Sequence, residues 1–170
     1  TSNLSKIEEF HSELEEPIVV KPLDGMGGQS IYKIEEINEE ECEILKKLTN
    51  NYKTQIVIQE FLPDIYDGDF RVLIIHGEPY KKTLARIPQG GSFKGNLAAG
   101  GKGEARDISD VQMRIGSVVG EYLIEKDINF AGIDIIGQKL IEINITSPTC
   151  AREIFEQSGM NPIEEYFKKL

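Results

Sequence analysis

The stretch FRVLIIHGEPYKKTLARI, residues 70–87, predicts an antiparallel β-hairpin. Two apolar segments flank the short connection at residues 76–78, whose glycine can adopt the backbone angles of a tight turn. Two more strands are predicted within NFAGIDIIGQKLIEINI, residues 129–145, around a short loop. Strands joined by hairpins run antiparallel, so the sequence favours a largely antiparallel sheet.

Helices are expected on both sides of these hairpins, because apolar residues recur there at helical spacing. The expected helices are Lys6 to about Glu15, Glu39 to Leu48, a segment after Ser109 to about Lys126, and a tail from about Glu153. Further strands are expected at residues 18–21, 30–34 and 56–61. Ser5 and Ser109 are the expected N-caps. The third helix should bury one face, comprising Ile115, Val118, Val119, Tyr122 and Leu123. Helices interspersed with hairpins predict an α+β fold.

The composition fits one ordinary domain of 170 residues, of which 39% are hydrophobic. The formal net charge of −10 argues against nucleic acid and anionic membranes as partners, because like charges repel. No segment is apolar over the thickness of a bilayer, and the first residues lack a signal-peptide pattern. Cys42 and Cys150 show no disulfide or metal-binding spacing. We therefore expect a soluble, cytoplasmic protein.

A lysine followed by a glycine-rich loop forms the first candidate site, KPLDGMGGQS, residues 21–30. Glycine permits positive φ angles and lets backbone amides approach an anion, while Lys21 adds a positive charge. The stretch is neither a P-loop nor a GxGxxG motif. Taken alone, it fits an anion site and an ordinary hairpin with a surface lysine equally well.

Acidic and amide side chains form the second candidate site. Glu142 and Asn144 are two residues apart, so they share one face of a strand. The opposite face carries Ile141, Ile143 and Ile145, which we expect to face the core. Carboxylate and amide oxygens bind Mg²⁺ in proteins, particularly together with nucleotide phosphates. The alternative is a solvated face of an edge hairpin.

Asp134 joins this face only if the connecting loop has a suitable length. A three-residue loop at residues 137–139 with a bulge would place Asp134 opposite Glu142. A two-residue turn at Gly137 and Gln138 would instead pair Asp134 with Ile141 and direct its carboxylate to the other face. The sequence leaves both forms open.

The segment VIQEFLPDIYDGDFRV, residues 57–72, offers further candidates for nucleotide binding. Backbone groups at residues 60–62 would be left unpaired, as adenine recognition requires, and Asp69 could accept hydrogen bonds from ribose hydroxyls. Aspartates are also ordinary turn residues. Arg71 and Arg86 lie on neighbouring strands, and two guanidiniums in so acidic a chain favour an anion, although an ion pair explains either one alone.

The segment from Gln89 to Arg106 contains six glycines and almost no large apolar side chain. Unstructured loops longer than about 12 to 15 residues are uncommon and are usually lids or disordered segments. The small polar residues here, with Lys94 and Lys102 as basic members, favour a lid that closes over anionic ligands and excludes water.

Together these stretches resemble the ATP-grasp portion of prokaryotic glutathione synthetases. The resemblance is carried by KPLDGMGG, DGDFRVL, LARIPQGG, GNLAAGG, GIDIIG and EINITSPTC, and it extends from about Ile18 to the helix after Cys150. It implies an ATP-grasp fold, with an antiparallel sheet and flanking helices. Within the whole chain, 1–170, it implies a small glycine-loop subdomain at residues 17–62 and a C-terminal catalytic subdomain at residues 63–170.

The resemblance also implies a carboxylate–amine ligase that makes glutathione. In that reaction ATP phosphorylates a carboxylate of γ-glutamylcysteine, the amine of glycine displaces phosphate, and ADP and phosphate are released. The implied cofactors are ATP and Mg²⁺ or Mn²⁺, and the implied assembly is a homo-oligomer, a tetramer in the family. The glycine loop would be a lid over the acyl phosphate.

The resemblance assigns roles to the matching residues of this sequence. The ATP phosphates fall to Lys21, Gly27, Gly28 and Ser30, and the adenine to Gln59, Glu60, Phe61 and Leu62. The ribose falls to Asp69, further nucleotide contact to Arg71, and Mg²⁺ to Asp134, Glu142 and Asn144. Arg86 is expected at the transferring phosphate, Gly95 and Asn96 in the closed lid, and Thr146, Ser147 and Arg152 at the peptide or glycine carboxylate.

The family enzyme has a further domain before the ATP-grasp portion, which supplies part of the peptide site and an additional ATP-contacting lysine. That domain is not found in this sequence, so we expect the chain to be a fragment rather than an inactive protein. Two alternatives stay open. One is an ATP-grasp ligase for another amino acid or peptide, and the other is a nucleotide-binding module without ligase activity.

Overall fold

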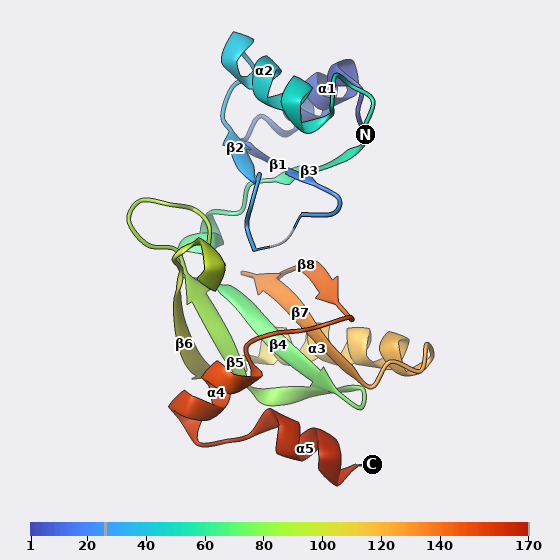
Figure 1. Cartoon of the computed structure of the whole chain (residues 1–170), viewed down its shortest axis with the longest axis vertical. Helices are drawn as coiled ribbons and strands as arrows, with labels where there is room; N and C mark the ends of the chain where they lie inside the picture. The colour runs from blue at the N-terminus through green and yellow to red at the C-terminus, as the bar shows by residue number, and fades with distance from the viewer. Residues whose placement is uncertain (26, 170) are drawn as a thin grey trace. The chain divides into compact units, whose positions relative to one another are not determined.

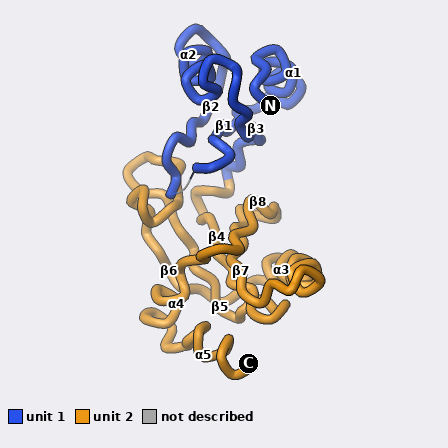
Figure 2. Tube along the Cα trace, turned by 45° about the vertical axis from the view of Figure 1, so that its right-hand side comes forward, with its two compact units in different colours: residues 1–63 blue, residues 64–170 orange. Residues whose placement is uncertain are grey.

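The computed structural model describes residues 1–25 and 27–169, so Met26 of the predicted glycine loop lies outside the described residues. The chain forms two compact units, Thr1–Pro63 and Asp64–Leu170, which Figure 2 colours separately. Each unit has an antiparallel sheet flanked by helices, and the predicted α+β class is confirmed. No helix in the described part of the chain is long and apolar enough to cross a bilayer.

Unit 1 is built on a three-stranded sheet in the order β2-β1-β3. Its elements are α1 (Leu4–Leu14), β1 (Ile18–Pro22), β2 (Tyr32–Ile34), α2 (Glu39–Leu48) and β3 (Ile56–Glu60). Figure 1 shows α1 and α2 together on one side of this sheet. Helices and sheet enclose a core of nearly inaccessible side chains: Ile7, Ile18, Val20, Ile34, Leu45 and Ile56.

Two element boundaries in unit 1 differ from the predicted ones. Asn3 rather than Ser5 caps α1, because its side-chain oxygen accepts a hydrogen bond from Lys6 N at 3.3 Å. The strand predicted at residues 30–34 begins only at Tyr32. Ser30 has a φ of 55°, which lies in the left-handed region and does not continue a strand.

Unit 2 contains a five-stranded antiparallel sheet in the order β6-β5-β4-β7-β8. Its strands are β4 (Asp69–Ile75), β5 (Glu78–Ile87), β6 (Lys102–Asp107), β7 (Phe130–Ile136) and β8 (Lys139–Asn144). Two short 3₁₀ helices, η1 (Pro63–Tyr66) and η2 (Leu97–Ala99), lie in the connections. Both predicted hairpins are present, as the pairs β4 with β5 and β7 with β8.

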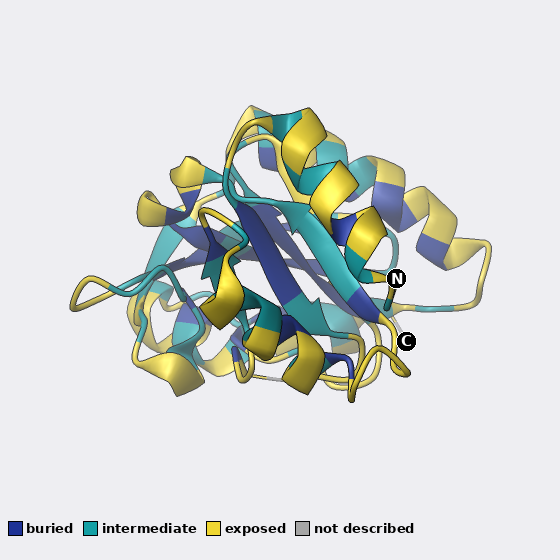
Figure 3. Ribbon diagram, turned by 90° about the horizontal axis from the view of Figure 1, so that it is seen from above, coloured by how far each residue is buried: buried dark blue, intermediate teal, exposed yellow. Residues whose placement is uncertain are grey.

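The two faces of this sheet are covered by different helices (Figure 1), and Figure 3 colours the ribbon by how far each residue is buried. One face packs on α3 (Asp110–Ile124), through Val72, Ile74, Ala131, Ile133 and Ile135. The other face packs on α4 (Ala151–Ser158) and α5 (Pro162–Lys168), which replace the single predicted tail, through Leu73, Ile75, Tyr80 and Leu84. Those apolar side chains occupy only part of the second face. The rest of that face carries polar groups.

Helix α3 begins at its predicted N-cap, Ser109, which exchanges hydrogen bonds with Gln112. Its predicted buried face is wrong at two positions, because Val118 is 69% exposed and Tyr122 is 54% exposed. The helix instead meets the sheet through a stripe centred on glycines: Gln112, Gly116, Val119, Gly120 and Leu123. A Cβ at Gly120 would lie 1.9 Å from Gly77 O, so the missing side chain determines which face turns inward.

Strand β6 occupies the end of the segment that was predicted to be a loop. Its residues pair with β5 from Lys82 to Ile87. The outer edge of β6 is bound by Gln157 of α4, whose Oε1 accepts from Ala105 N at 2.8 Å and whose Nε2 donates to Gly103 O at 3.1 Å. A side-chain amide thus satisfies backbone groups that an edge strand leaves open. No apolar alternation marks this strand, so the sequence pattern could not predict it.

Replacing Gln157 by alanine should loosen β6. We expect the free energy of unfolding in urea to fall by about 1 kcal/mol, since two exposed hydrogen bonds are lost. Amide hydrogen exchange at Ala105 should become faster. The control Gln157→Glu keeps the acceptor for Ala105 N but loses the donor to Gly103 O, so its effect should be intermediate. Unchanged exchange at Ala105 in Gln157→Ala would contradict this role.

Candidate active site

Four charged side chains meet on the polar part of the second sheet face of unit 2. In the strand register, Asp69 lies opposite Arg86, and Arg71 lies opposite Asp134. Asp69 and Arg71 are two residues apart in β4, so all four point to one face. Each residue is at most 9% exposed. The sheet therefore buries two arginines and two aspartates whose formal charges cancel.

Asp134 is at the centre of this group. Arg71 donates to its carboxylate from Nε at 2.5 Å and from Nη2 at 3.0 Å, and Arg86 Nη2 lies 2.9 Å from Asp134 Oδ2. Arg86 Nη2 is also 2.5 Å from Asp69 Oδ2, while Arg86 Nε donates to Asp69 O at 3.3 Å. The contacts of Arg86 Nη2 are ion pairs without hydrogen-bond geometry. Asp69 Oδ1 is buried and accepts no hydrogen bond from any described residue.

The two carboxyl groups have opposite pKa shifts. Burial opposes the charge of Asp134, but hydrogen bonds from Arg71 and the charge of Arg86 outweigh it and lower the pKa of Asp134. Among the described residues, Asp69 forms an ion pair with Arg86 alone; burial outweighs that attraction and, with the nearby charge of Asp134, raises the pKa of Asp69 to about 6. Burial also opposes the charge of Arg86, yet Asp69 and Asp134 raise the pKa of Arg86, which remains a cation.

Asp134 lies opposite Glu142, so both carboxylates are on the same face of the sheet. The connection differs from both forms left open by the sequence. Ile136 pairs with Lys139, which leaves a two-residue turn in which Gly137 has a φ of 56°. The register then shifts, and Ile141 is the extra residue of a bulge in β8. The bulge, and not a longer loop, brings Asp134 opposite Glu142.

The isoleucines of β8 do not face a core, contrary to the expectation from the sequence. Ile143 is 39% exposed and Ile145 is 49% exposed, and only Ile141 is partly buried. Strand β8 is the edge of the sheet, and α3 packs chiefly against β4 and β5. The face of β8 that was predicted to be inside is therefore exposed in this unit.

The polar face of β7 and β8 fits a hard divalent cation. Asp134 Oδ1 accepts one hydrogen bond and so retains a lone pair, and Glu142 is exposed. Asn144 lies opposite Gly132, and its buried Nδ2 has no hydrogen-bond partner among the described residues, so this amide is not required by the fold. Within residues 1–25 and 27–169, no three His, Cys, Asp or Glu side chains are placed so that they could hold a metal ion together. The third protein ligand would therefore be an amide oxygen, which Mg²⁺ accepts.

The glycine-rich segment before β6 packs directly on the buried charges. A Cβ at Gly95 would lie 2.4 Å from Arg86 O and 3.1 Å from Asp69 Cβ. Asn96 O accepts hydrogen bonds from the backbone of residues 99 and 101 at 2.9 and 3.1 Å. Around Gly90 and Gly91, by contrast, a Cβ would meet no described atom within 4 Å. The segment thus has a base fixed to the ion pair and an open tip.

The segment after β8 crosses in front of β7 to reach α4 (Figure 1). Thr146 and Ser147 are exposed on it. Cys150, which ends it, is 3% exposed, and burial raises the pKa of its thiol. The Arg152 side chain is 78% exposed and forms surface ion pairs with Glu153 and Glu156, so it is not part of the buried group of charges.

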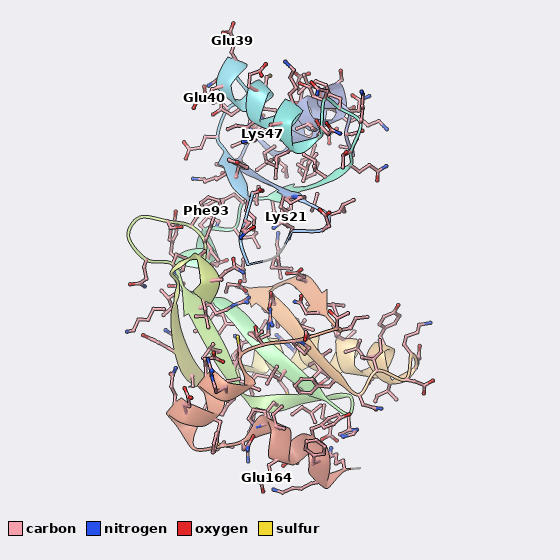
Figure 4. The ribbon with its side chains drawn as sticks, viewed as in Figure 1. Lys21, Glu39, Glu40, Lys47, Phe93 and Glu164 are labelled. Atoms are coloured by element: carbon pink, nitrogen blue, oxygen red, sulfur yellow. The ribbon has the colours of Figure 1, made fainter. Side chains whose placement is uncertain are left out.

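The other predicted site residues belong to unit 1. Lys21, labelled in Figure 4, is half-buried near the end of β1. In the loop that follows, Gly27 and Gly28 have φ angles of 64° and 79°, and Ser30 has 55°. The glycines therefore provide the positive φ angles that the sequence predicts. Ser30 adopts a conformation that is uncommon for a residue with a side chain.

The segment predicted to bind adenine follows β3. Gln59 and Glu60 still pair with β1, and Phe61 N donates to Pro17 O at 2.8 Å, so the fold uses one of the groups expected to be unpaired. Lys33 Nζ lies 4.3 Å from the centre of the Phe61 ring, a cation–π contact that holds the ring against β2. Leu62 is partly buried.

Two features of the site were not predicted from the sequence. Asp69, the expected ribose acceptor, is buried against Arg86, a pairing that depends on a register shift between Val72 and Ile74. Gly132 makes room for the Arg71 side chain, since a Cβ there would lie 2.8 Å from Arg71 Cδ. A shift of register leaves no mark in the residue pattern, and the space that Gly132 leaves for Arg71 depends on packing between strands. No sequence signal therefore pointed to either feature.

Comparison with known proteins gives a family match over most of the chain. Residues 1–159 match the family described as "Prokaryotic glutathione synthetase, ATP-grasp domain". Glutathione synthetases from Vibrio parahaemolyticus, Escherichia coli and Photorhabdus laumondii are 48%, 47% and 46% identical to this chain over the aligned residues. The alignments cover 91%, 91% and 99% of this chain and 48%, 48% and 56% of those proteins. The chain thus spans about half the length of the curated relatives it matches.

Solved structures share the fold at much lower identity. A D-cycloserine synthetase has a TM-score of 0.69 at 14% identity, covering 87% of this chain and 54% of that one. The ATP-grasp ligase PsnB, complexed with a minimal precursor, Mg and ADP, has a TM-score of 0.68 at 16% sequence identity; the match covers 99% of this chain and 50% of that one. D-alanine–D-alanine ligase from Bacillus anthracis has a TM-score of 0.59 at 12% sequence identity; the match covers 95% of this chain and 56% of that one. The predicted ATP-grasp fold is confirmed.

The raised pKa of Asp69 predicts a specific dependence of stability on pH. The folded value of about 6 exceeds the ordinary 3.8, so the folded chain binds the proton more tightly than the unfolded chain. The resulting stabilisation is present below about pH 4 and is lost as the pH rises through 6, by about 3 kcal/mol in total. Urea unfolding at pH 4, 5, 6 and 7 measures it.

The matched variant for this measurement is Asp69→Asn, which cannot titrate. It should lack the fall in stability between pH 4 and pH 7 that the parent shows. A ¹³C NMR titration of the carboxyl groups should show one aspartate with a midpoint near pH 6 in the parent and none in the variant. Equal slopes of stability against pH in both proteins would refute the assignment.

Proposed function

Since the chain belongs to the prokaryotic glutathione synthetase family through its ATP-grasp domain, we propose that it binds Mg²⁺-ATP and forms the nucleotide-dependent part of a carboxylate–amine ligase. The family match over residues 1–159 and relatives at 46 to 48% identity support the proposal. The chain covers about half of those relatives, so the complete reaction is proposed for the longer protein to which such a domain corresponds.

One observation carries this proposal: the buried Arg86 of β5 lies next to a face of β7 and β8 that carries acidic and amide side chains. Arg86 lies 2.9 Å from Asp134, and Asp134 lies opposite Glu142. A fixed guanidinium suits a phosphate, and carboxylate and amide oxygens suit Mg²⁺. The proposed ligands of the metal are Asp134, Glu142 and Asn144. When bound, Mg²⁺ would neutralise charge on the phosphate oxygens.

For unit 1 we propose contacts to the nucleotide itself. Lys21 would bind the phosphates as a point charge, assisted by the loop that contains Gly27, Gly28 and Ser30. Residues 59–62 would contact the adenine through their backbone, and the cation–π contact of Lys33 would hold Phe61 in place. The positive φ angles of this loop support the first role, because they allow successive amides to approach one anion.

We propose that the full reaction forms glutathione. The terminal phosphoryl group of ATP passes to a carboxylate of γ-glutamylcysteine, giving ADP and an acyl phosphate. The amine of glycine then attacks the acyl carbon, loses a proton and displaces phosphate. Arg86 would bind the transferring phosphoryl group, and Arg71 would act beside it through Asp134. Neither step needs a nucleophilic side chain, so the protein's contribution is position and charge.

The remaining proposed contacts are those of the lid and of the substrate carboxylates. Gly95 and Asn96 would belong to the closed lid over the acyl phosphate; the close approach of Gly95 to Arg86 O supports this role. Thr146, Ser147 and Arg152 would contact the peptide or glycine. Asp69 would contact the ribose only if nucleotide binding changes the ion pair between Asp69 and Arg86.

Removing the metal-binding side chains should weaken nucleotide binding. We expect the parent chain to bind Mg²⁺-ATP in calorimetry and the double variant Glu142→Ala/Asn144→Ala to bind it at least about 10-fold more weakly. A matched control is Glu121→Ala, which removes an exposed carboxylate on α3 and should leave binding unchanged. Phosphate release with γ-glutamylcysteine and glycine, compared with other amines, then tests the substrate.

The outcomes separate the proposed parts. Equal affinity of parent and double variant would mean that Mg²⁺ is not bound by this face. No binding by a folded parent chain would contradict the nucleotide site itself. Phosphate release with an amine other than glycine would replace the proposed substrate but leave the nucleotide site in place.

A further inference from the structure

Gly132 in β7 stands two residues before Asp134, on the same face of the sheet. A Cβ built there would lie 2.8 Å from Arg71 Cδ and 2.8 Å from Pro148 Cβ, closer than real contacts allow. The φ angle of Gly132 is not among the positive values of this chain, so its backbone suits alanine. The structure therefore requires glycine at this position for space, not for conformation.

Neither neighbour of Gly132 can move at low cost. Arg71 makes two hydrogen bonds to Asp134 while 6% exposed, and its own backbone carbonyl accepts from Thr83 Oγ1 at 2.8 Å. Pro148 contributes a rigid ring to the segment that crosses β7. An added methyl group would thus displace either the Arg71 guanidinium from Asp134 or the crossing segment from the sheet.

We propose that Gly132 is a positioning residue: its missing side chain lets Arg71 cross β7 and orient the Asp134 carboxylate beside Glu142 and Asn144. The proposal rests on the function proposed above, in which those three residues bind Mg²⁺. Gly132 touches no ligand in this role. It acts through Arg71, which fixes the direction of the Asp134 carboxylate. In metalloproteins, residues that hydrogen-bond to a metal ligand orient that ligand in the same way.

The variant Gly132→Ala tests this directly. The matched control is Gly103→Ala in β6, another strand glycine without a positive φ, where a Cβ would meet only leucine methyl groups at 3.2 and 3.3 Å. We expect Mg²⁺-ATP affinity, measured by calorimetry, to fall roughly 10- to 100-fold in Gly132→Ala and to stay unchanged in Gly103→Ala. Equal affinities in parent and Gly132→Ala would overturn the proposal.

A second readout does not depend on nucleotide binding. The Nε–H of Arg71 donates to a buried carboxylate at 2.5 Å, so its signal in a ¹H–¹⁵N spectrum should be shifted downfield and exchange slowly. The variant Arg71→Lys identifies that signal by its loss. It should persist in Gly103→Ala and disappear or move in Gly132→Ala. An unchanged signal in folded Gly132→Ala would refute the positioning role even if the parent binds no nucleotide.

A double-mutant cycle covers the case in which Gly132→Ala does not fold. Once Arg71 is replaced by methionine, whose flexible chain can bend away, the added methyl group has less to displace. We therefore expect Gly132→Ala to lower the melting temperature much less in the Arg71→Met background than in the parent. An equal loss in both backgrounds, or unfolding of the double variant while Arg71→Met folds, would show that Gly132 does not act through Arg71.

Discussion

A carboxylate held between two guanidiniums is the constraint on which the rest of unit 2 depends. Asp134 accepts two hydrogen bonds from Arg71 and faces Arg86 at 2.9 Å, all three nearly inaccessible to water. Removing one partner from such a group leaves a buried charge whose desolvation is uncompensated, at a cost of about 3 to 5 kcal/mol. Strands β4, β5 and β7 must therefore keep one register. The apolar packing of α3, α4 and α5 fixes these strands, and the charges determine how they align.

That register depends on two irregularities in otherwise regular hairpins. The turn of the first hairpin pairs Ile75 with Glu78, and an unbroken ladder from there would place Asp69 opposite Leu84. The shift between Val72 and Ile74 moves Asp69 opposite Arg86. In the second hairpin the bulge at Ile141 has the same effect for Asp134 and Glu142. Each irregularity removes hydrogen bonds from the ladder, and each aligns acidic side chains with their partners on one face.

The sequence predicts what local patterns determine. Apolar runs around a glycine-containing turn predicted both hairpins, and Ser109 predicted the start of α3. The resemblance of ordered motifs predicted the ATP-grasp fold.

Which residues are buried between elements was harder to predict. Val118 has the spacing of a core residue, yet the helix approaches the sheet through Gly120. Strand β6 is formed by a ladder and by Gln157, without apolar alternation. For the candidate site, the residue types were predictable, but the pairing of Asp69 with Arg86 depended on a register shift that no motif records.

Arginine suits both cationic positions for a geometric reason. The fork of Arg71 spans both oxygens of Asp134 with two hydrogen bonds, whereas a lysine ammonium would bind there as a point charge. Arg86 Nη2 lies within ion-pair distance of both Asp69 and Asp134. The four charges cancel, so a phosphate arriving alone would leave this buried region negative. A divalent cation arriving alone would leave it positive beside two guanidiniums. A metal–phosphate pair brings both charges together and preserves the balance that burial requires. If Mg²⁺-ATP binds here as proposed, this charge balance would favour the complex over either ion alone.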